Sequence, residues 1–232
     1  MFERYSICAP KATLADRFGI EISENYKPIY NAGPSMPLPV IVADNPKGLS
    51  RCYWGQPPGW AKKKSLSEKL ISAQAELIPQ KPVFRKKLRN KRCLIPADSL
   101  YFWKKTGKKS AIPYRFVFPD TAIFSIAGLW EEFEDESGKA THTFMVLTKP
   151  SPGNLAHFSE RWPFILSVEE EKIWLNVDTP EDELLQLISQ NRDSDFEMYS
   201  VSSRINSLQE NDAGLIKPMP PADQFGNLSL FD

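Results

Sequence analysis

The stretch Pro82–Trp103, PVFRKKLRNKRCLIPADSLYFW, joins a strongly basic segment to two short apolar ones. Six of the eight residues from Arg85 to Arg92 are Lys or Arg, and none is acidic. Phe84 and Leu88 lie four residues apart, so a helix here has one apolar side and positive charge elsewhere. The stretch predicts a basic amphipathic helix, and its positive side fits either a solvated surface or an anion-binding face.

Strands are predicted on the C-terminal side of this helix. Cys93–Ile95 and Leu100–Trp103 are apolar, and with the break at Pro96–Ser99 between them they predict a β-hairpin. Tyr114, Phe116 and Phe118 alternate along Pro113–Phe118. The successive segments Leu100–Lys105, Pro113–Phe118, Ala122–Phe133 and Thr141–Thr148 suggest an antiparallel meander of long hairpins. Further predicted strands are Met1–Cys8, Leu38–Val42, Arg51–Trp54 and Phe196–Val201.

Predicted helices flank these strands. Thr13–Phe18 is a short candidate, and Ser167 is a suitable N-cap for Ser167–Leu175. Thr179 and Pro180 suit the N-cap and first position of another helix. The expectation is one α+β domain over residues 1–232, mostly antiparallel, with a Pro-rich tail from about residue 216.

Composition limits the functional classes. A hydrophobic content of 41% with 12% aromatic residues is typical of a folded globule. No stretch approaches the roughly 18 apolar residues that a membrane span needs. The N-terminus lacks the basic region followed by an apolar run that is typical of a signal peptide. The three cysteines are far apart and the two histidines form no ligand pair, so we expect a cytoplasmic protein without a metal site or cofactor.

The net charge of zero conceals two oppositely charged halves. Residues 61–115 carry a net +13, whereas residues 116–232 carry a net −14. The two halves of one fold can simply attract each other. The alternative is a basic surface for a polyanion such as single-stranded DNA.

A set of short segments, in order along nearly the whole chain, carries a family resemblance. They are Tyr30–Pro34, Trp54-Gly55, Pro58–Trp60, Ala73–Glu76, Lys81–Arg85, Arg92–Asp98, Tyr101, Trp103–Lys105, Ala127–Glu131, Arg161, Pro163, Val201-Ser202 and Asn206. In these segments the chain resembles the SRAP family (SOS response-associated peptidase domain), also called abasic site processing proteins. The resemblance implies a strand-rich, barrel-like core with peripheral helices and a basic groove for single-stranded DNA.

The resemblance also implies a chemistry. In the family, removal of the initiator Met exposes an N-terminal Cys, whose thiolate and α-amine form a thiazolidine crosslink with the aldehyde of an abasic site. A Glu and a His handle protons, and an Asn and an Arg position the DNA strand. A peptidase-like cleavage of the family's own N-terminus is attributed to the same residues.

This chain departs from the family at four of those positions. Phe2 stands where the family has the nucleophilic Cys, and Phe102 stands where it has the acidic Glu. Gln74 replaces the Arg, which removes its charge and fork geometry. Ser159 replaces the His, with His157 two residues upstream. Phenylalanine cannot titrate, so the first hypothesis is a member that binds DNA but has lost the crosslinking and peptidase chemistry.

Five residues match positions where the family meets or shapes its DNA groove, and a loop tryptophan beside lysines can also stack on an unpaired base. Each of these side chains is equally consistent with retained fold geometry. The five are Arg4, Asn31, Trp60, Arg85 and Arg161.

Two alternatives remain open. Cys8 is a candidate replacement nucleophile, although six residues of strand place it about 20 Å from residue 2. The other alternative is a non-catalytic scaffold. Phe2 and Phe102 would then line an apolar pocket for a small ligand or a partner's side chain.

Overall fold

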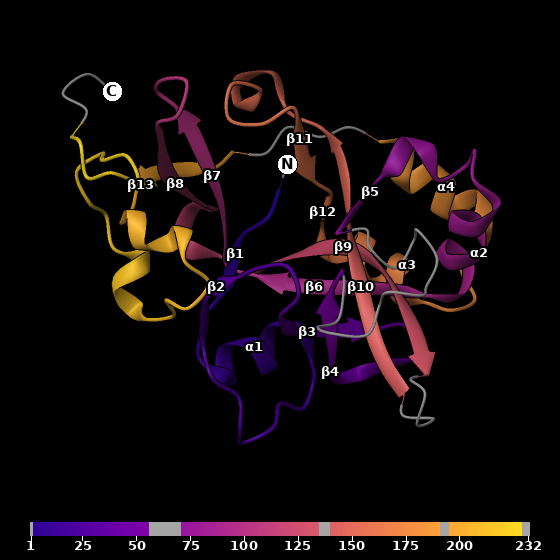
Figure 1. Ribbon diagram of the computed structural model, residues 1–232. Coiled ribbons are helices and arrows are strands. Elements are labelled where there is room, and N and C mark those ends of the chain that lie inside the picture. The colour runs from indigo at the N-terminus through magenta and orange to yellow at the C-terminus, as the bar shows by residue number, and fades with distance from the viewer. Residues whose placement is uncertain (1, 56–70, 135–139, 191–194, 229–232) are drawn as a thin grey trace.

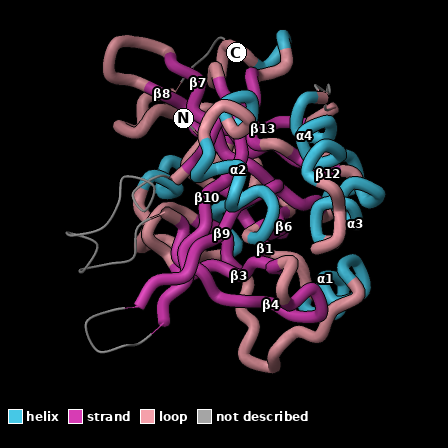
Figure 2. The backbone as a smooth tube through the Cα atoms, turned by 90° about the vertical axis from the view of Figure 1, so that its right-hand side faces the viewer, coloured by secondary structure: helices cyan, strands magenta, loops and turns pink. Residues whose placement is uncertain are grey.

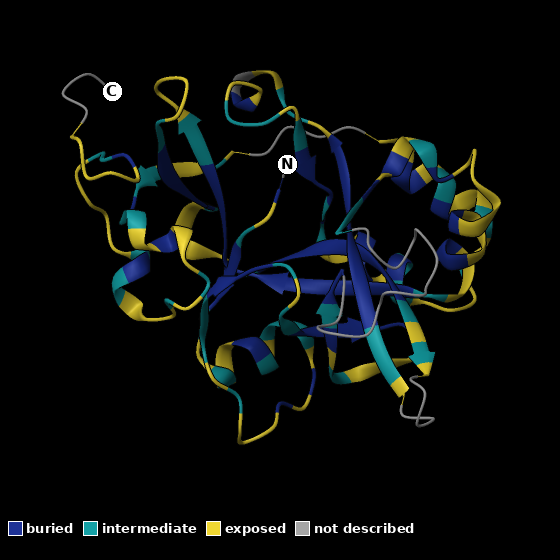
Figure 3. Ribbon diagram, in the orientation of Figure 1, coloured by how far each residue is buried: buried dark blue, intermediate teal, exposed yellow. Residues whose placement is uncertain are grey.

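The computed structural model describes residues 2–55, 71–134, 140–190 and 195–228. Its strands form two sheets, and three helices gather on one side of the molecule (Figure 1). The view turned by 90° shows the same three helices, α2, α3 and α4, lying together (Figure 2). Buried residues concentrate in the central strands, and exposed residues lie in the outer helices and turns (Figure 3).

The larger sheet closes on itself as a barrel. Five strands form a hydrogen-bonded ring in the order β10, β4, β3, β6, β9 and back to β10. Within the ring only β4 and β10 run parallel. Their bounds are β3 Pro37–Val42, β4 Asn45–Trp54, β6 Arg92–Ala97, β9 Phe124–Glu134 and β10 Ala140–Pro150. Short strands extend the ring: β5 Ser72–Gln74 and β11 Arg161–Pro163 beside β10, and β12 Ile165–Leu166 beside β9.

Gly128 lies where the ring is most tightly closed. It pairs with Cys93 on β6 and with Val146 on β10. A Cβ atom at this position would lie 2.7 Å from Ile95 Cδ1 and 3.0 Å from the Met145 carbonyl oxygen. Because two strands approach it from opposite sides, no larger residue fits without moving them.

The second sheet is antiparallel throughout, in the order β13, β8, β7, β1, β2. Asp98 alone separates β6 of the barrel from β7 of this sheet, so one residue joins the two sheets. The bounds are β1 Tyr5–Ile7, β2 Ile29–Ala32, β7 Ser99–Lys105, β8 Ala111–Val117 and β13 Glu197–Ser200.

Arg92 ties two helices to the barrel. Its guanidinium donates to the carbonyls of Leu88 and Arg89 at the end of α2, and to those of Trp174 and Asn176 at the end of α3. These carbonyls have no partner within their helices, and a positive charge is favourable at a helix C-terminus. The bounds are α1 Lys11–Phe18, α2 Pro82–Asn90, α3 Val168–Leu175 and α4 Glu181–Ser189.

The C-terminal segment packs against the free side of the second sheet. Its 3₁₀ turns, Ser203–Asn206 and Ala213–Ile216, follow β13. They surround a small apolar cluster, separate from the main core, that is completed by partly buried aromatic rings. Its buried members are Tyr101, Val201, Ile205 and Leu215.

The predicted α+β class, the mostly antiparallel sheets and the barrel-like core are confirmed. The predicted hairpin of Cys93–Ile95 with Leu100–Trp103 is wrong, because β6 and β7 belong to different sheets. The predicted meander is wrong between β8 and β9 for the same reason. The turn Pro119–Thr121 carries the chain from one sheet to the other. Ser167 caps α3 as predicted, with Glu170 completing a capping box, whereas the N-cap of α4 is Pro180 and not Thr179. No helix in the described ranges is both long and apolar enough to cross a membrane.

Candidate functional site

The two phenylalanines at the family's catalytic positions lie together where the barrel meets the second sheet. Phe2 precedes β1 and is fully buried. Its ring centroid is 5.6 Å from that of Trp54 on β4 and 5.8 Å from that of Phe102 on β7. Phe102 is 2% exposed and stacks on Trp162 of β11 at 4.2 Å, with 11° between the ring planes. Packed aromatic rings therefore occupy the place where the resemblance puts a nucleophile and an acid.

The other two positions lie on an exposed polar rim beside these rings. Gln74 on β5 pairs with Thr148 on β10 and is exposed. Ser159 precedes β11, and its hydroxyl donates to the Arg161 carbonyl at 2.8 Å. His157 is exposed, with its ring 4.3 Å from that of Phe158. The structure thus separates the four positions into two buried hydrocarbons and two surface polar groups.

Arg161 is the charged centre of this rim. Both of its terminal nitrogens bond Glu76, with Nη2 3.0 Å from Oε2, and Nη2 also donates to the Thr148 carbonyl at 2.5 Å. Hydrogen bonding from Arg161 is the main cause that lowers the pKa of Glu76. An anion that approaches Arg161 must therefore compete with a carboxylate already bound in the fork geometry that guanidinium favours.

Asn31 lies against the C-terminal segment, and Arg4 lies beside Gly33. The Asn31 amide is fully buried and donates to the carbonyls of Ile205, Ser207 and Glu210 at 2.9–3.3 Å. Arg4 is partly buried, and burial lowers the pKa of its guanidinium. Its Nη1 would lie 2.9 Å from a Cβ on Gly33. Asn31 therefore uses its side-chain N–H donors to hold the segment in place, and these donors are not available to a ligand.

The basic helix α2 forms as predicted, and most of its basic side chains pair with carboxylates of the same protein. Arg85 Nε donates to Glu181 of α4 at 2.6 Å, and Arg89 lies 3.3 Å from the same carboxylate. Lys87 is buried and lies 2.7 Å from Glu131 of β9. These pairs join the basic and acidic halves of the sequence. Trp60 lies outside the described residues.

The thiols are poorly suited to replace the missing nucleophile. Cys52 and Cys93 are at most 1% exposed, and burial raises the pKa of each. Cys8 is partly exposed, but burial and the nearby Asp98 carboxylate raise the pKa of its thiol to about 12. The thiolate is the reactive form of cysteine, and very little of it is present at neutral pH when the pKa is this high. Cys8 also lies against Asp98 and not against the rings around Phe2.

Sequence reasoning gave Glu76 no role, although it ends one of the matching segments. Its partner Arg161 is 85 residues away along the chain, so no local spacing links them. Within the described ranges, no group of His, Cys, Asp and Glu side chains could hold a metal ion.

Comparison with known proteins agrees with this geometry. The family model for SOS response associated peptidase (SRAP) matches residues 1–208. The chain is 36% identical over 221 residues to abasic site processing protein YoaM of Bacillus subtilis, across 93% of this chain and 97% of that protein. It is 25% identical to abasic site processing protein YedK of Escherichia coli, across 90% and 93% of the two chains. A solved structure from Bacteroides thetaiotaomicron has the same fold, with a TM-score of 0.79 at 24% identity over 93% of this chain and 99% of that one. The chain belongs to the SRAP family.

Proposed function

We propose that this protein binds single-stranded or abasic-site DNA without forming the family's covalent crosslink through residue 2. Membership of the SRAP family associates it with the processing of damaged DNA. The observation that carries the proposal is the burial of Phe2, which is 0% exposed and packs on Trp54 and Phe102. A hydrocarbon ring at this position offers no electron pair to an aldehyde.

Acid–base chemistry at the same place is equally unsupported. Phe102 is stacked between Trp162 and the edge of Phe116, whose centroid is 5.6 Å away. Neither Phe2 nor Phe102 can take or give a proton. Because both rings are buried against other rings, they fill the position and do not line an open apolar cleft. This packing favours a retained scaffold over a new ligand pocket at the former catalytic position.

The polar rim supports retained DNA binding. Gln74 pairs with Thr148, and the Arg161 guanidinium donates to the Thr148 carbonyl, so both side chains lie near this residue. Each can contact a phosphate or a base edge. Arg85 contributes a further charge on α2, although Glu181 partly neutralises it. Since Arg161 and Arg85 both have carboxylate partners, we expect modest affinity that falls steeply as salt is added.

The first experiment tests the covalent step. Purified protein is incubated with a single-stranded oligonucleotide that carries one abasic site, and with an undamaged strand of the same sequence, before a denaturing gel. We expect no heat-stable protein–DNA band, whereas a family member that keeps the N-terminal Cys serves as the positive control. A Phe2→Cys chain prepared with residue 2 at its N-terminus tests whether the thiol is the missing group. A covalent band from the unmodified protein would contradict the proposal, and a Cys8→Ser variant would then locate the nucleophile.

The second experiment tests binding. Native gel shifts at low and moderate salt compare the unmodified protein with Arg161→Ala, and with Lys47→Ala as a control that removes one exposed charge from β4. If Arg161 contacts a phosphate, its loss reduces the slope of log affinity against log salt by about 0.7. The control should keep the slope. If no gel shift appears at low salt, DNA binding is excluded and the non-catalytic scaffold is the role that remains.

A further inference from the structure

A cavity of about 550 Å³ lies away from the aromatic rings around Phe2. It is bounded by α1, the chain just after β1, the turn before β9 and Ile216 of the C-terminal segment. Its charged lining residues are Arg17, Asp98, Arg115 and Asp120. Its volume is within the usual range for sites that hold a small molecule.

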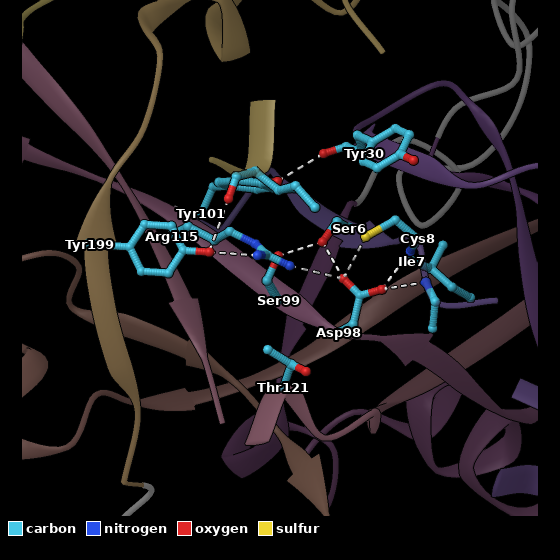
Figure 4. A network of polar contacts seen from close by, with 12 residues as sticks. Ser6, Ile7, Cys8, Tyr30, Asp98, Ser99, Tyr101, Arg115, Thr121 and Tyr199 are labelled. Carbon is cyan, nitrogen blue, oxygen red and sulfur yellow. Dashed lines mark hydrogen bonds and ion pairs between the residues drawn. The ribbon is translucent and has the colours of Figure 1, made fainter. Parts of the chain in front are cut away.

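Asp98 is fully engaged by the protein. Its carboxylate accepts hydrogen bonds from the Ser6 hydroxyl, from the Cys8 amide and, at 2.9 Å, from the Ala9 amide (Figure 4). The side chain is only 4% exposed. Two backbone N–H groups and a hydroxyl therefore stabilise its charge, and Asp98 depends little on Arg115.

Arg115 is held much less completely. It is 5% exposed, and a guanidinium has five N–H donors. Its Nη1 donates to the Tyr199 hydroxyl at 2.6 Å, its Nη2 lies 3.5 Å from Asp98 Oδ1, and its Nε has no acceptor in the described part of the chain (Figure 4). Buried donors without acceptors are costly, so this guanidinium favours an additional acceptor.

The remaining walls are mostly apolar. Arg17 also lines the cavity, but both of its terminal nitrogens bond Glu171, at 2.9 and 2.6 Å. The turn on one side holds Asp120 and Thr121 at φ 60° and 51°. A β-branched residue rarely adopts this conformation, and such strain is found more often at binding sites than elsewhere. The apolar lining consists of Ala9, Pro10, Ala122, Ile123 and Ile216.

We propose that this cavity binds a small amphipathic monocarboxylate, with its carboxylate on Arg115 and its hydrocarbon part against the apolar walls. A carboxylate supplies two acceptors in the spacing that a guanidinium fork prefers. The apolar lining favours a ligand with a hydrocarbon body over a bare inorganic anion.

Octanoate is the probe, and octan-1-ol is the uncharged control of the same length. Calorimetric titration should show saturable binding of octanoate and at least tenfold weaker binding of octan-1-ol. The amide resonances that shift in ¹H–¹⁵N spectra should belong to Cys8, Ala9 and residues 121–123. Equal affinity for the alcohol, or shifts confined to other parts of the protein, would overturn the proposal.

A pair of tryptophan variants in α1 locates the site without changing Arg115, and Arg115→Lys then tests the guanidinium. Thr13 is exposed and lines the cavity, whereas its neighbour Ala12 is exposed and does not. Thr13→Trp should reduce octanoate affinity at least tenfold, and Ala12→Trp should leave it unchanged. Arg115→Lys keeps the charge but loses the fork, so it should weaken octanoate more than octan-1-ol. Binding unaffected by Thr13→Trp would overturn the assignment. DNA shifts are measured on the same variants, so this proposal and the DNA proposal fail independently.

Discussion

Single side chains that the resemblance places at DNA-facing positions are hydrogen-bonded to other parts of this protein. The Asn31 amide reaches three carbonyls, and Arg161 reaches Glu76 and Thr148. Arg85 bonds Glu181. A ligand at these residues therefore replaces existing partners instead of meeting free groups. The cost of that replacement sets the affinity, and it differs between Asn31, which is buried, and Arg161 and Arg85, which are nearer to solvent.

Glu76 gives a test of pH dependence at this scale. Its pKa is lowered in the folded protein by Arg161, so the pair adds stability above the ordinary Glu pKa of about 4.3 and loses it as the pH falls through the folded value. The side chain is 45% exposed, so solvent limits the contribution to about 0.5 kcal/mol. Glu76→Gln should lower the free energy of unfolding by that amount at pH 7, measured by urea denaturation. The difference should disappear near pH 3. A constant difference across that range would mean that packing, not charge, is responsible.

Arg92 provides the largest expected effect of a single conservative change. It is 1% exposed and donates to carbonyls at the ends of two helices. Lysine keeps the charge but concentrates its donors at one point, and cannot reach both helices. Arg92→Lys should therefore destabilise the protein by about 3 kcal/mol. Arg89→Lys on the exposed side of α2 is the matched control and should change stability by less than about 0.5 kcal/mol. Similar midpoints for both variants in urea denaturation would rule out this role for Arg92.

At the scale of elements, local signals in the sequence predicted whether a segment is a helix or a strand better than they predicted which strands pair. The alternation and the aromatic content locate β7, β8, β9 and β10, and Ser167 with Glu170 marks the start of α3. No local pattern shows that β8 and β9 lie in different sheets, because a turn of Pro and Asp suits a hairpin equally well. The parallel pairing of β4 with β10 is also a long-range contact that only the closed barrel explains.

The site could be predicted in part, for the same reason. The substitutions at Phe2 and Phe102 are evident from the matching segments, and their burial follows from two apolar residues in a strand-rich core. The hydrogen bonds of Asn31 and the pairing of Glu76 with Arg161 join residues 85 or more positions apart. The cavity beside Arg115 is assembled from five separate parts of the chain. Such groupings depend on tertiary structure, which spacing along the sequence does not encode.

Gly128 tests the closure of the barrel. Gly128→Ala places a methyl group within 3.0 Å of atoms from Ile95, Cys93 and Met145, which lie on both neighbouring strands. We expect a loss of about 1–3 kcal/mol from overpacking. Gly48→Ala is the control, because its nearest neighbour would be 3.9 Å away. Equal unfolding midpoints for the two variants would show that the barrel has more room at β9 than its geometry indicates.

At the scale of the whole molecule, the basic and acidic parts of the sequence form ion pairs with each other within the fold. Arg85 and Arg89 of the basic half pair with Glu181 of the acidic half, and Lys87 pairs with Glu131. These contacts favour the interpretation that the halves attract each other. They also leave the basic helix with less free charge than its sequence suggests, so any DNA surface depends more on the rim around Arg161.

Asn31 holds the C-terminal segment at three carbonyls, beside the contacts of Tyr30 with Asn211 and of Trp103 with Asn206. Asn31→Asp replaces three donated hydrogen bonds with a carboxylate that faces three carbonyl oxygens in a fully buried place. Hydrogen-exchange protection in residues 201–216 should fall about tenfold or more, while that of the barrel changes much less. Asn211→Asp keeps the acceptor for the Tyr30 amide and is the control. Unchanged protection in the segment would show that other contacts hold it.

The parallel pairing of β4 with β10 also has a consequence for biosynthesis. β4 ends at Trp54, and its partner on the open side begins only at Ala140. At about 5–20 residues per second, the ribosome needs roughly 4–17 s to make the chain between them. During that time β4 presents unpaired backbone groups that can join the strands of neighbouring nascent chains. Slower translation of that interval therefore lengthens the period in which aggregation competes with folding.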